Sequence, residues 1–175
     1  MHHVVFKSTI ITLIVLAVAA IPAKGQLIPE RSFPLAEAES VALSHLEKAA
    51  LSAAKDLGPC TTTATALCLQ GNRFAVGVGW RTSNGAAGQG QAVQLTSDSG
   101  YFWFFSPTNI ELIVKVINAC SPPFNRYWVF AAGLTNVEVS IAVIDGVSEL
   151  VNTYTNPLNR PVPPLQDTDA FNTCP

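Results

Sequence analysis

Hydrophobic and polar residues alternate with a period of two along three long segments of the chain, at 73–81, 110–117 and 137–144. In each segment every second residue is a large apolar one over seven positions. Such alternation is typical of β-strands that bury one face and leave the other face wetter. Shorter runs that also predict strands lie at 66–69, 91–96, 101–105, 127–132 and 149–155.

Turn-forming residues separate the predicted strands, at Gly71-Asn72, Ser83-Asn84-Gly85, 97–100, Pro122-Pro123, Asp145-Gly146 and Asn156-Pro157. No helical segment lies among these strands. The pattern therefore predicts an all-β fold, an immunoglobulin-like β-sandwich of about 7–8 antiparallel strands. A small barrel is the alternative architecture. A parallel α/β fold is excluded, because no connecting segment is long and helical enough for a crossover.

A helical period marks the segment that precedes the strands. Apolar residues recur every three to four positions from Leu43 to Leu57, and Gly58-Pro59 follows them. We therefore expect a short N-terminal amphipathic helix over 35–58. Its apolar stripe is mostly alanine, so we expect it to dock on the β-domain. The alternatives are pairing with a partner and a free tether.

The first residues predict a secretory signal peptide over 1–25. Lys7 precedes an uncharged run over 10–21, and the small-residue site Ala23-Lys24-Gly25 follows. The run is shorter than the roughly 20 residues of a transmembrane helix, so we expect no stable membrane insertion after cleavage. An uncleaved anchor is the alternative.

The mature protein is then expected to be secreted or periplasmic. It would consist of a linker over 26–34, the helix, and a disulfide-stapled β-sandwich domain over 60–175.

Charge is sparse in this chain, since only 13% of the residues are Asp, Glu, Lys or Arg. The chain has 10 basic and 12 acidic residues, and the signal peptide takes away Lys7 and Lys24. The mature protein is therefore acidic, which argues against nucleic acid as a partner. A low charge content is common among extracellular β-proteins and identifies no ligand.

Four cysteines remain in the mature chain: Cys60, Cys68, Cys120 and Cys174. An even number in an exported protein predicts two disulfides, for which three pairings are possible. Zinc is the rival interpretation, but no CxxC or HxxxH pair is present. The short Thr/Ala-rich turn between the first two cysteines favours Cys60–Cys68, which leaves Cys120 to pair with Cys174.

A series of motifs runs through the predicted strands. It comprises Leu67-Cys68-Leu69, the strand 73–81, Gly90-Gln91-Ala92-Val93, 95–105 with its Gly-Tyr-Phe-Trp-Phe-Phe run, 109–116, Tyr127-Trp128-Val129-Phe130, 134–138 and Tyr154-Thr155-Asn156-Pro157. Over roughly 60–174 this series resembles a β-sandwich domain family that recurs in exported bacterial proteins and has no established activity.

The resemblance implies the same two disulfides, because the early cysteine pair of that family can occur without the later pair. It provides no catalytic residue to transfer to this chain. The chain departs from the family pattern at Ser121-Pro122-Pro123 and in its N-terminal helix.

No catalytic or metal-binding constellation stands out. His45 is the only histidine after the signal peptide, and it lies in the predicted helix, so a Ser-His-Asp or Cys-His arrangement is not expected. Glu111 and Glu138 alternate with apolar residues, which predicts a place on the solvent face. Asp167-Thr168-Asp169 offers two ligands to calcium, which needs about six to eight oxygens. We therefore expect no metal, no cofactor and no enzymatic activity, a carboxylate-based hydrolase being the least favoured function.

The aromatic run over 101–105 is the one feature that points to binding. In a strand its alternate rings must face opposite sides. The favoured interpretation places one set in the core and the other under the 83–90 loop or the helix, with Trp80 and Trp128 in the core. Exposed rings could instead stack on sugars or hold a protein partner.

The candidate binding surface comprises Tyr101, Trp103, Phe105, Arg126 and Tyr127. The sequence thus predicts an exported, non-enzymatic binding or accessory module for an extracellular glycan or protein. The alternative is a structural or protein-interaction domain, either inhibitor-like or associated with the cell envelope.

Overall fold

The computed structural model of the chain describes residues 28–34, 44–54 and 59–175. The predicted signal peptide, and residues 35–43 and 55–58 of the predicted helix, lie outside the described residues.

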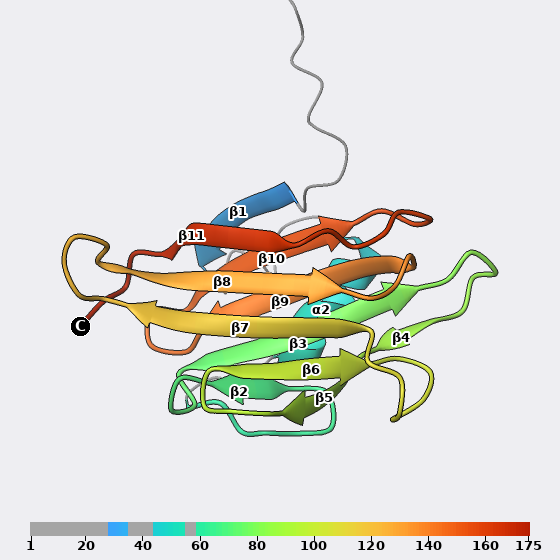
Figure 1. Ribbon diagram of the computed structural model, residues 1–175, viewed down its shortest axis with the longest axis horizontal. Helices are drawn as coiled ribbons and strands as arrows, with labels where there is room; N and C mark the ends of the chain where they lie inside the picture. Colours follow the sequence, from blue (N-terminus) through green and yellow to red (C-terminus); the bar gives the residue numbers. More distant parts are fainter. Residues whose placement is uncertain (1–27, 35–43, 55–58) are drawn as a thin grey trace, which may run out of the picture.

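Two antiparallel β-sheets face each other and enclose the core (Figure 1). The six-stranded sheet contains, in spatial order, β1 (Ile28–Pro34), β10 (Leu150–Asn156), β9 (Glu138–Asp145), β3 (Phe74–Arg81) and β2 (Leu67–Leu69), with β4 (Ala87–Gln89) paired to β3. The five-stranded sheet contains β11 (Leu165–Phe171), β8 (Arg126–Gly133), β7 (Leu112–Ala119), β6 (Ser99–Trp103) and β5 (Gln91–Gln94). The helix α2 (His45–Ala54) packs on the six-stranded sheet.

The predicted all-β sandwich with a short helix is confirmed, and the described strands do not close into a barrel. Each of the eight segments predicted as strands overlaps an observed strand. Three further strands were not expected: β1 lies in the predicted linker, β4 in the Gly-rich loop and β11 in the C-terminal segment. None of the three shows alternation of apolar and polar residues with a period of two, because β1 and β11 are edge strands and β4 has only three residues.

The core lies between the two sheets. Phe74, Val76 and Val78 of β3 are fully buried and meet residues such as Phe102 and Val114 of the facing sheet. Each such side chain contributes about 1.5–3 kcal/mol when it is fully buried. The hydrophobic contact between the sheets is therefore the main stabilising term of the fold.

The helix covers the outer side of the six-stranded sheet at very close range. Glycines of β3 make this possible, because a Cβ atom on Gly77 would overlap the helix backbone at Ala50 and lie 2.7 Å from the backbone nitrogen of Ala54. Ser44 caps the helix, since its hydroxyl accepts the N–H of Glu47 at 3.2 Å while the Glu47 carboxylate accepts the N–H of Ser44 at 2.7 Å. The expected docking of the helix on the β-domain is therefore confirmed.

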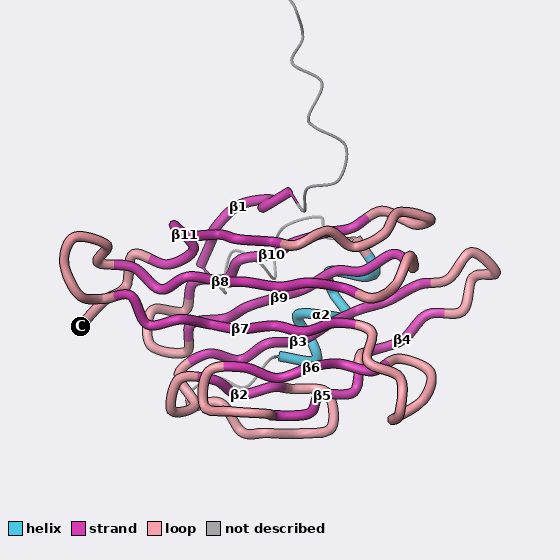
Figure 2. Tube along the Cα trace, in the orientation of Figure 1, coloured by secondary structure: helices cyan, strands magenta, loops and turns pink. Residues whose placement is uncertain are grey.

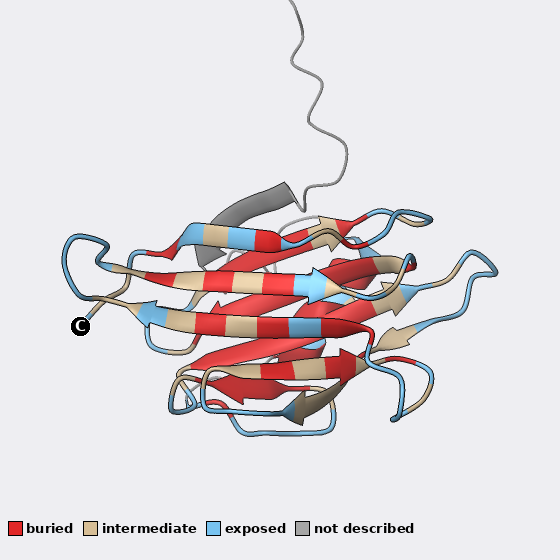
Figure 3. Cartoon of the chain, viewed as in Figure 1, coloured by how far each residue is buried: buried red, intermediate tan, exposed pale blue. Residues whose placement is uncertain are grey.

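This docking changes the burial of β3 and β9. Both strands are buried on both faces along most of their length, so the wetter face that the alternation predicted is absent from them. Figure 3 shows this difference, with continuous burial in the rear sheet and alternating burial along β6, β7 and β8 in front.

The two predicted disulfides, Cys60–Cys68 and Cys120–Cys174, are both present. Disulfides of this kind are typical of proteins that fold in an oxidising, extracytoplasmic compartment. Within the described ranges, no helix has the length and apolar character that crossing a membrane requires.

Candidate binding surface

The outer side of the five-stranded sheet carries large apolar side chains. Along β6 the buried Phe102 alternates with the half-buried Tyr101 and Trp103, so these two rings point away from the core. The same alternation along β7 and β8 turns a further set outward. We define the aromatic face as this outward set with the adjoining Phe124: Val93, Tyr101, Trp103, Ile113, Ile117, Phe124, Trp128 and Phe130.

The strand register arranges the aromatic face as a diagonal band. Tyr101 of β6 lies beside Ile113 of β7, and Trp128 of β8 lies beside Ile117, four residues further along β7. Two strand spacings of about 4.8 Å separate β6 from β8, and the offset along the strands places their rings still further apart. The band therefore offers an extended, gently twisted surface.

The rings at the β8 end of the aromatic face contact one another. Phe124 meets Trp128 edge-on at 5.0 Å between centroids, and Trp128 lies nearly parallel to Phe130 at 6.1 Å. Phe124 is 55% exposed and Ile113 is 40% exposed, which is high for large apolar residues. The indole N–H of Trp128 has no hydrogen-bond partner among the described residues. These contacts hold the rings in a fixed arrangement.

Charged side chains on and around the aromatic face are paired with each other. Lys115 lies 3.0 Å from the carboxylate of Asp98, whose pKa is lowered by the hydrogen bond from Thr96 and by Lys115. At the rim Arg126 donates to Asp169 at 2.6 Å. The described part of this face therefore carries compensated charges rather than a field of one sign.

Neutral polar groups accompany the rings in the register. Gln91 of β5 lies beside Trp103, and Gln166 of β11 lies beside Phe130. Both amides thus flank the band, one at each side of the sheet. The aromatic face combines ring surface with uncharged hydrogen-bonding groups.

No described segment lies over the aromatic face. Figure 1 shows β8, β7 and β6 in front with nothing drawn across them, and Figure 2 places the longer loops at the two ends of the sandwich. The helix packs on the opposite side of the molecule, against β3 and β9. The expectation that the second set of rings would pack under the helix or the 83–90 loop is therefore wrong.

The five residues of the predicted binding surface separate in space. Tyr101 and Trp103 lie on the aromatic face, and Arg126 lies at its rim. Phe105 is 53% exposed, but it packs against Trp80 at 5.0 Å, at the end of the sandwich where β6 leads into β7. Tyr127 is buried in the core.

The assignment of the two neighbours in β8 has to be reversed. Trp128 was expected in the core, yet Tyr127 occupies the core and Trp128 points outward. Both alternating sets of β8 are apolar, so hydrophobicity alone does not say which set faces inward. The pairing of Trp128 with Ile117, also outward, gives the correct side. Phe124, Ile113 and Phe130 are further members of the face that the sequence did not single out. By contrast, Trp80 packs against the core as expected.

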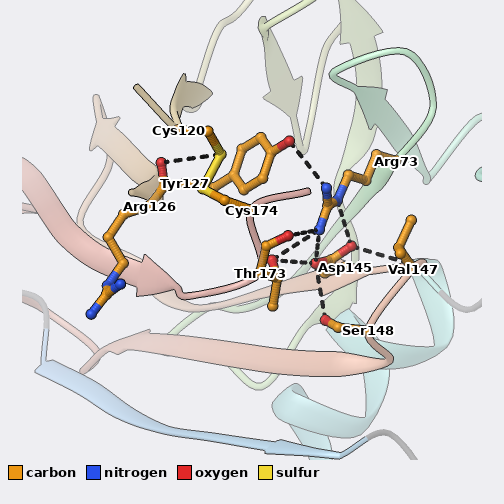
Figure 4. A network of polar contacts seen from close by, with 9 residues as sticks. All are labelled: Arg73, Cys120, Arg126, Tyr127, Asp145, Val147, Ser148, Thr173 and Cys174. Carbon is orange, nitrogen blue, oxygen red and sulfur yellow. Dashed lines mark hydrogen bonds and ion pairs between the residues drawn. A yellow bond between two sulfur atoms is a disulfide. The ribbon is translucent and has the colours of Figure 1, made fainter. Parts of the chain in front are cut away.

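A buried polar network joins the two sheets at one end of the sandwich (Figure 4). Arg73 donates to both carboxylate oxygens of Asp145, at 2.9 and 2.7 Å, to the carbonyl and hydroxyl oxygens of Thr173, at 2.6 and 2.9 Å, and to the hydroxyl of Tyr127 at 3.1 Å. Thr173 and Ser148 donate to Asp145 as well. The network thereby fixes the C-terminal segment to the six-stranded sheet.

Asp145 has a structural role. Burial raises the pKa of this carboxyl group, but hydrogen bonds from Arg73 and Thr173, with further donors, outweigh burial and leave the pKa below its ordinary value. A carboxylate with a lowered pKa and four donor groups around it is a poor proton acceptor. We assign the network to stability rather than to catalysis.

One of the two glutamates predicted on the solvent face, Glu111, differs from expectation. Glu111 is buried at 4% exposure and accepts a hydrogen bond from the Asn109 amide. Lys115 of β7 pairs with Asp98. Glu138 is half-buried and pairs with Arg81 across the sheet. Glu111 is therefore buried in the protein interior.

The possible calcium ligands are engaged with protein groups. Asp167 accepts the hydroxyl of Tyr154 at 2.8 Å, and Asp169 is held by Arg126. His45 is exposed on the helix. Over the ranges 28–34, 44–54 and 59–175, no group of three or more His, Cys, Asp or Glu side chains is placed to hold a metal ion.

Comparison of the chain with protein-family models, with curated proteins and with solved structures found no match.

Proposed function

We propose that this protein is an exported binding module that holds an extracellular ligand on the aromatic face. One observation carries the proposal: a band of rings and β-branched residues lies on a sheet face that no described segment covers, while the helix covers the equivalent face of the other sheet. Large apolar patches on protein surfaces mark interaction sites. The predicted signal peptide and the two disulfides support an extracytoplasmic location.

A non-enzymatic role fits the polar groups of the described residues. The buried polar cluster around Arg73 and Asp145 uses its donors and acceptors within the protein. Around the aromatic face, Lys115 is paired with Asp98 and Arg126 with Asp169. The motifs that resemble an exported bacterial domain family agree with an accessory role.

The test compares one added charge on the aromatic face with the same charge elsewhere. Ile113→Lys places an additional ammonium group beside Tyr101, next to Lys115, which is already paired with Asp98. Val147→Lys places one in the β9–β10 turn, where Val147 is 73% exposed. The full chain is passed over immobilised neutral polysaccharides, anionic polysaccharides, peptidoglycan and the protein itself.

We expect at least one of these surfaces to retain the wild-type protein and the Val147→Lys variant equally. Retention of Ile113→Lys should fall at least tenfold, because a charge at the centre of an apolar contact must lose its water. Equal retention of the two variants, or no retention on any surface, would overturn the proposal.

A further inference from the structure

The charge pattern of the aromatic face favours a ligand without net charge. A cationic or anionic ligand would compete with the existing pairs, because Lys115 is held by Asp98 and Arg126 by Asp169. An anionic chain would also approach the two carboxylates of these pairs. Complementarity of charge normally requires an unpaired field of opposite sign, and the described part of the face presents none.

The polar groups beside the rings are suited to hydroxyl groups. Each amide of Gln91 and Gln166 can donate two hydrogen bonds and accept further ones, as two adjacent sugar hydroxyls require. They lie in register with Trp103 and Phe130 respectively. The Gln91 amide donates one hydrogen bond to the carbonyl of Gln89 at 3.5 Å. An apolar protein partner would still have to bury the remaining hydrogen-bonding groups of Gln91 and those of Gln166 without water, which is unfavourable. A sugar chain can cover a ring and satisfy the neighbouring amide together.

We propose that the aromatic face binds a neutral polysaccharide. Its rings pack against the apolar faces of the sugar rings, and Gln91 and Gln166 bind the hydroxyl groups at the two sides of the band. The rings of β6 and those of β8 are separated by more than the roughly 10 Å between the two strands, and this distance accommodates a chain of sugars rather than one sugar unit. This inference rests on the proposed function and specifies its ligand class.

The experiment uses two phenylalanines of nearly equal exposure as a matched pair. Phe124 is 55% exposed on the aromatic face, and Phe105 is 53% exposed beside Trp80, outside it. The full chain and its variants Phe124→Ala, Phe105→Ala and Gln166→Ala migrate through native gels. The gels contain hydroxyethyl cellulose, glucomannan, xylan or glycogen as neutral polymers, and alginate or polygalacturonate as anionic polymers. Sedimentation velocity over a range of concentrations measures self-association.

The inference predicts that a neutral polymer slows the wild-type protein and the Phe105→Ala variant alike. Phe124→Ala and Gln166→Ala should bind at least about fivefold more weakly, as expected for groups that contact the ligand directly. Unfolding measurements on the same variants establish that they are folded.

Three results would overturn the inference, and they bear differently on the proposed function. If only anionic polymers slow the protein, or if it self-associates and Ile113→Lys abolishes the self-association, the ligand is not a neutral polysaccharide. In both cases the aromatic face remains a binding surface. Retardation that Phe105→Ala weakens as much as Phe124→Ala would place the glycan elsewhere and count against both proposals.

Discussion

The outer faces of the two sheets differ in the size of their side chains, and this difference decides what each face contacts. The six-stranded sheet presents small residues such as Gly77 and Gly79, over which the helix backbone approaches to van der Waals distance. The five-stranded sheet presents Tyr101, Trp103 and Trp128 on its outer side. Rings of that size prevent a helix backbone from packing closely on the sheet, so the ring surfaces themselves remain available for contact.

The comparison shows that hydrophobicity alone does not distinguish structure from function in a sandwich. Both outer faces are apolar, but one is used within the chain and the other has no described cover. Side-chain volume is the feature that separates them, because small residues fit a helix whereas broad rings suit a ligand that lies flat.

The largest expected effect comes from one substitution made on both outer faces. Ile144 is 3% exposed beneath the helix, and Ile113 is 40% exposed on the aromatic face. Ile144→Lys should lower the free energy of unfolding by roughly 5 kcal/mol, because it removes buried apolar surface and introduces an unpaired charge. Ile113→Lys should change it by less than about 0.5 kcal/mol. Urea unfolding followed by tryptophan fluorescence measures both, and similar losses would show that the aromatic face is packed after all.

Each sheet has its own disulfide, and removing them separately sharpens the comparison. Cys60–Cys68 closes a separation of 8 residues beside the helix, and Cys120–Cys174 closes one of 54 residues on the five-stranded sheet. The loop-entropy relation predicts a loss of about 4 kcal/mol when Cys120 and Cys174 become serine, against about 2.5 kcal/mol for the other pair. Thermal unfolding of the two double variants measures both losses. A larger loss of stability on removal of Cys60–Cys68 than on removal of Cys120–Cys174 would contradict this account.

The Arg73–Asp145 network joins the two sheets, and its loss should affect both. Asp145→Asn should destabilise the protein by about 3 kcal/mol, because Arg73 then remains largely buried without a counter-charge. Glu138→Gln, which breaks the more exposed pair with Arg81, provides the control and should cost less than about 1 kcal/mol. Both variants are compared by urea unfolding. If the network did not stabilise the protein, Asp145→Asn and Glu138→Gln would lower the free energy of unfolding equally.

The pH dependence of stability follows from the lowered pKa of Asp145. The carboxylate is ionised in both the folded and the unfolded state above the unfolded pKa of about 3.9, so its contribution is complete there. As the pH falls below about 4, the unfolded state takes up its proton first and stability declines through the lower folded pKa. Asp145→Asn should reduce this acid-dependent loss, and an unchanged profile between pH 5 and pH 2 would contradict the assignment.

The smallest change tests the close approach of the helix. Gly77→Ala adds one methyl group that overlaps the helix backbone and should destabilise the fold by about 2 kcal/mol. Ala132→Leu adds more volume to the outer side of the five-stranded sheet, where Ala132 is exposed, and should change stability by less than about 0.5 kcal/mol. Equal effects would mean that the two outer faces do not differ in packing.

The sequence predicts the sandwich well because the two-residue period is clear in β3, β7 and β9, which lie inside the two sheets. The strands at 73–81 and 137–144 were found within one or two residues of their expected bounds. The edge strand Leu165–Phe171 was missed, since its middle consists of Asp167, Thr168 and Asp169 and its pairing with β8 is irregular. Polar residues at a sheet edge do not produce alternation.

The binding surface was only partly predictable from the sequence. Period two divides β6 and β8 into two sets each, but it does not say which set faces the core when both are apolar. Tyr127 and Trp128 were therefore each predicted on the wrong face of the sheet. Phe124 lies in a turn, and its edge contact with Trp128 depends on the three-dimensional path of the chain. The side of the sandwich on which the helix docks was equally undetermined, although Gly77 and Gly79 indicate it once the fold is known.

Side-chain oxidation by hydroxyl radicals tests the central claim most directly, because it reports the exposure of individual rings. The full chain is oxidised with and without the polysaccharide that slows it most in native gels, and the modified residues are quantified by mass spectrometry. We predict that the ligand protects Tyr101, Trp103, Phe124 and Trp128 while Phe105 and Leu134, also exposed, react as before. Protection of Phe105 with no change on the aromatic face would contradict the account.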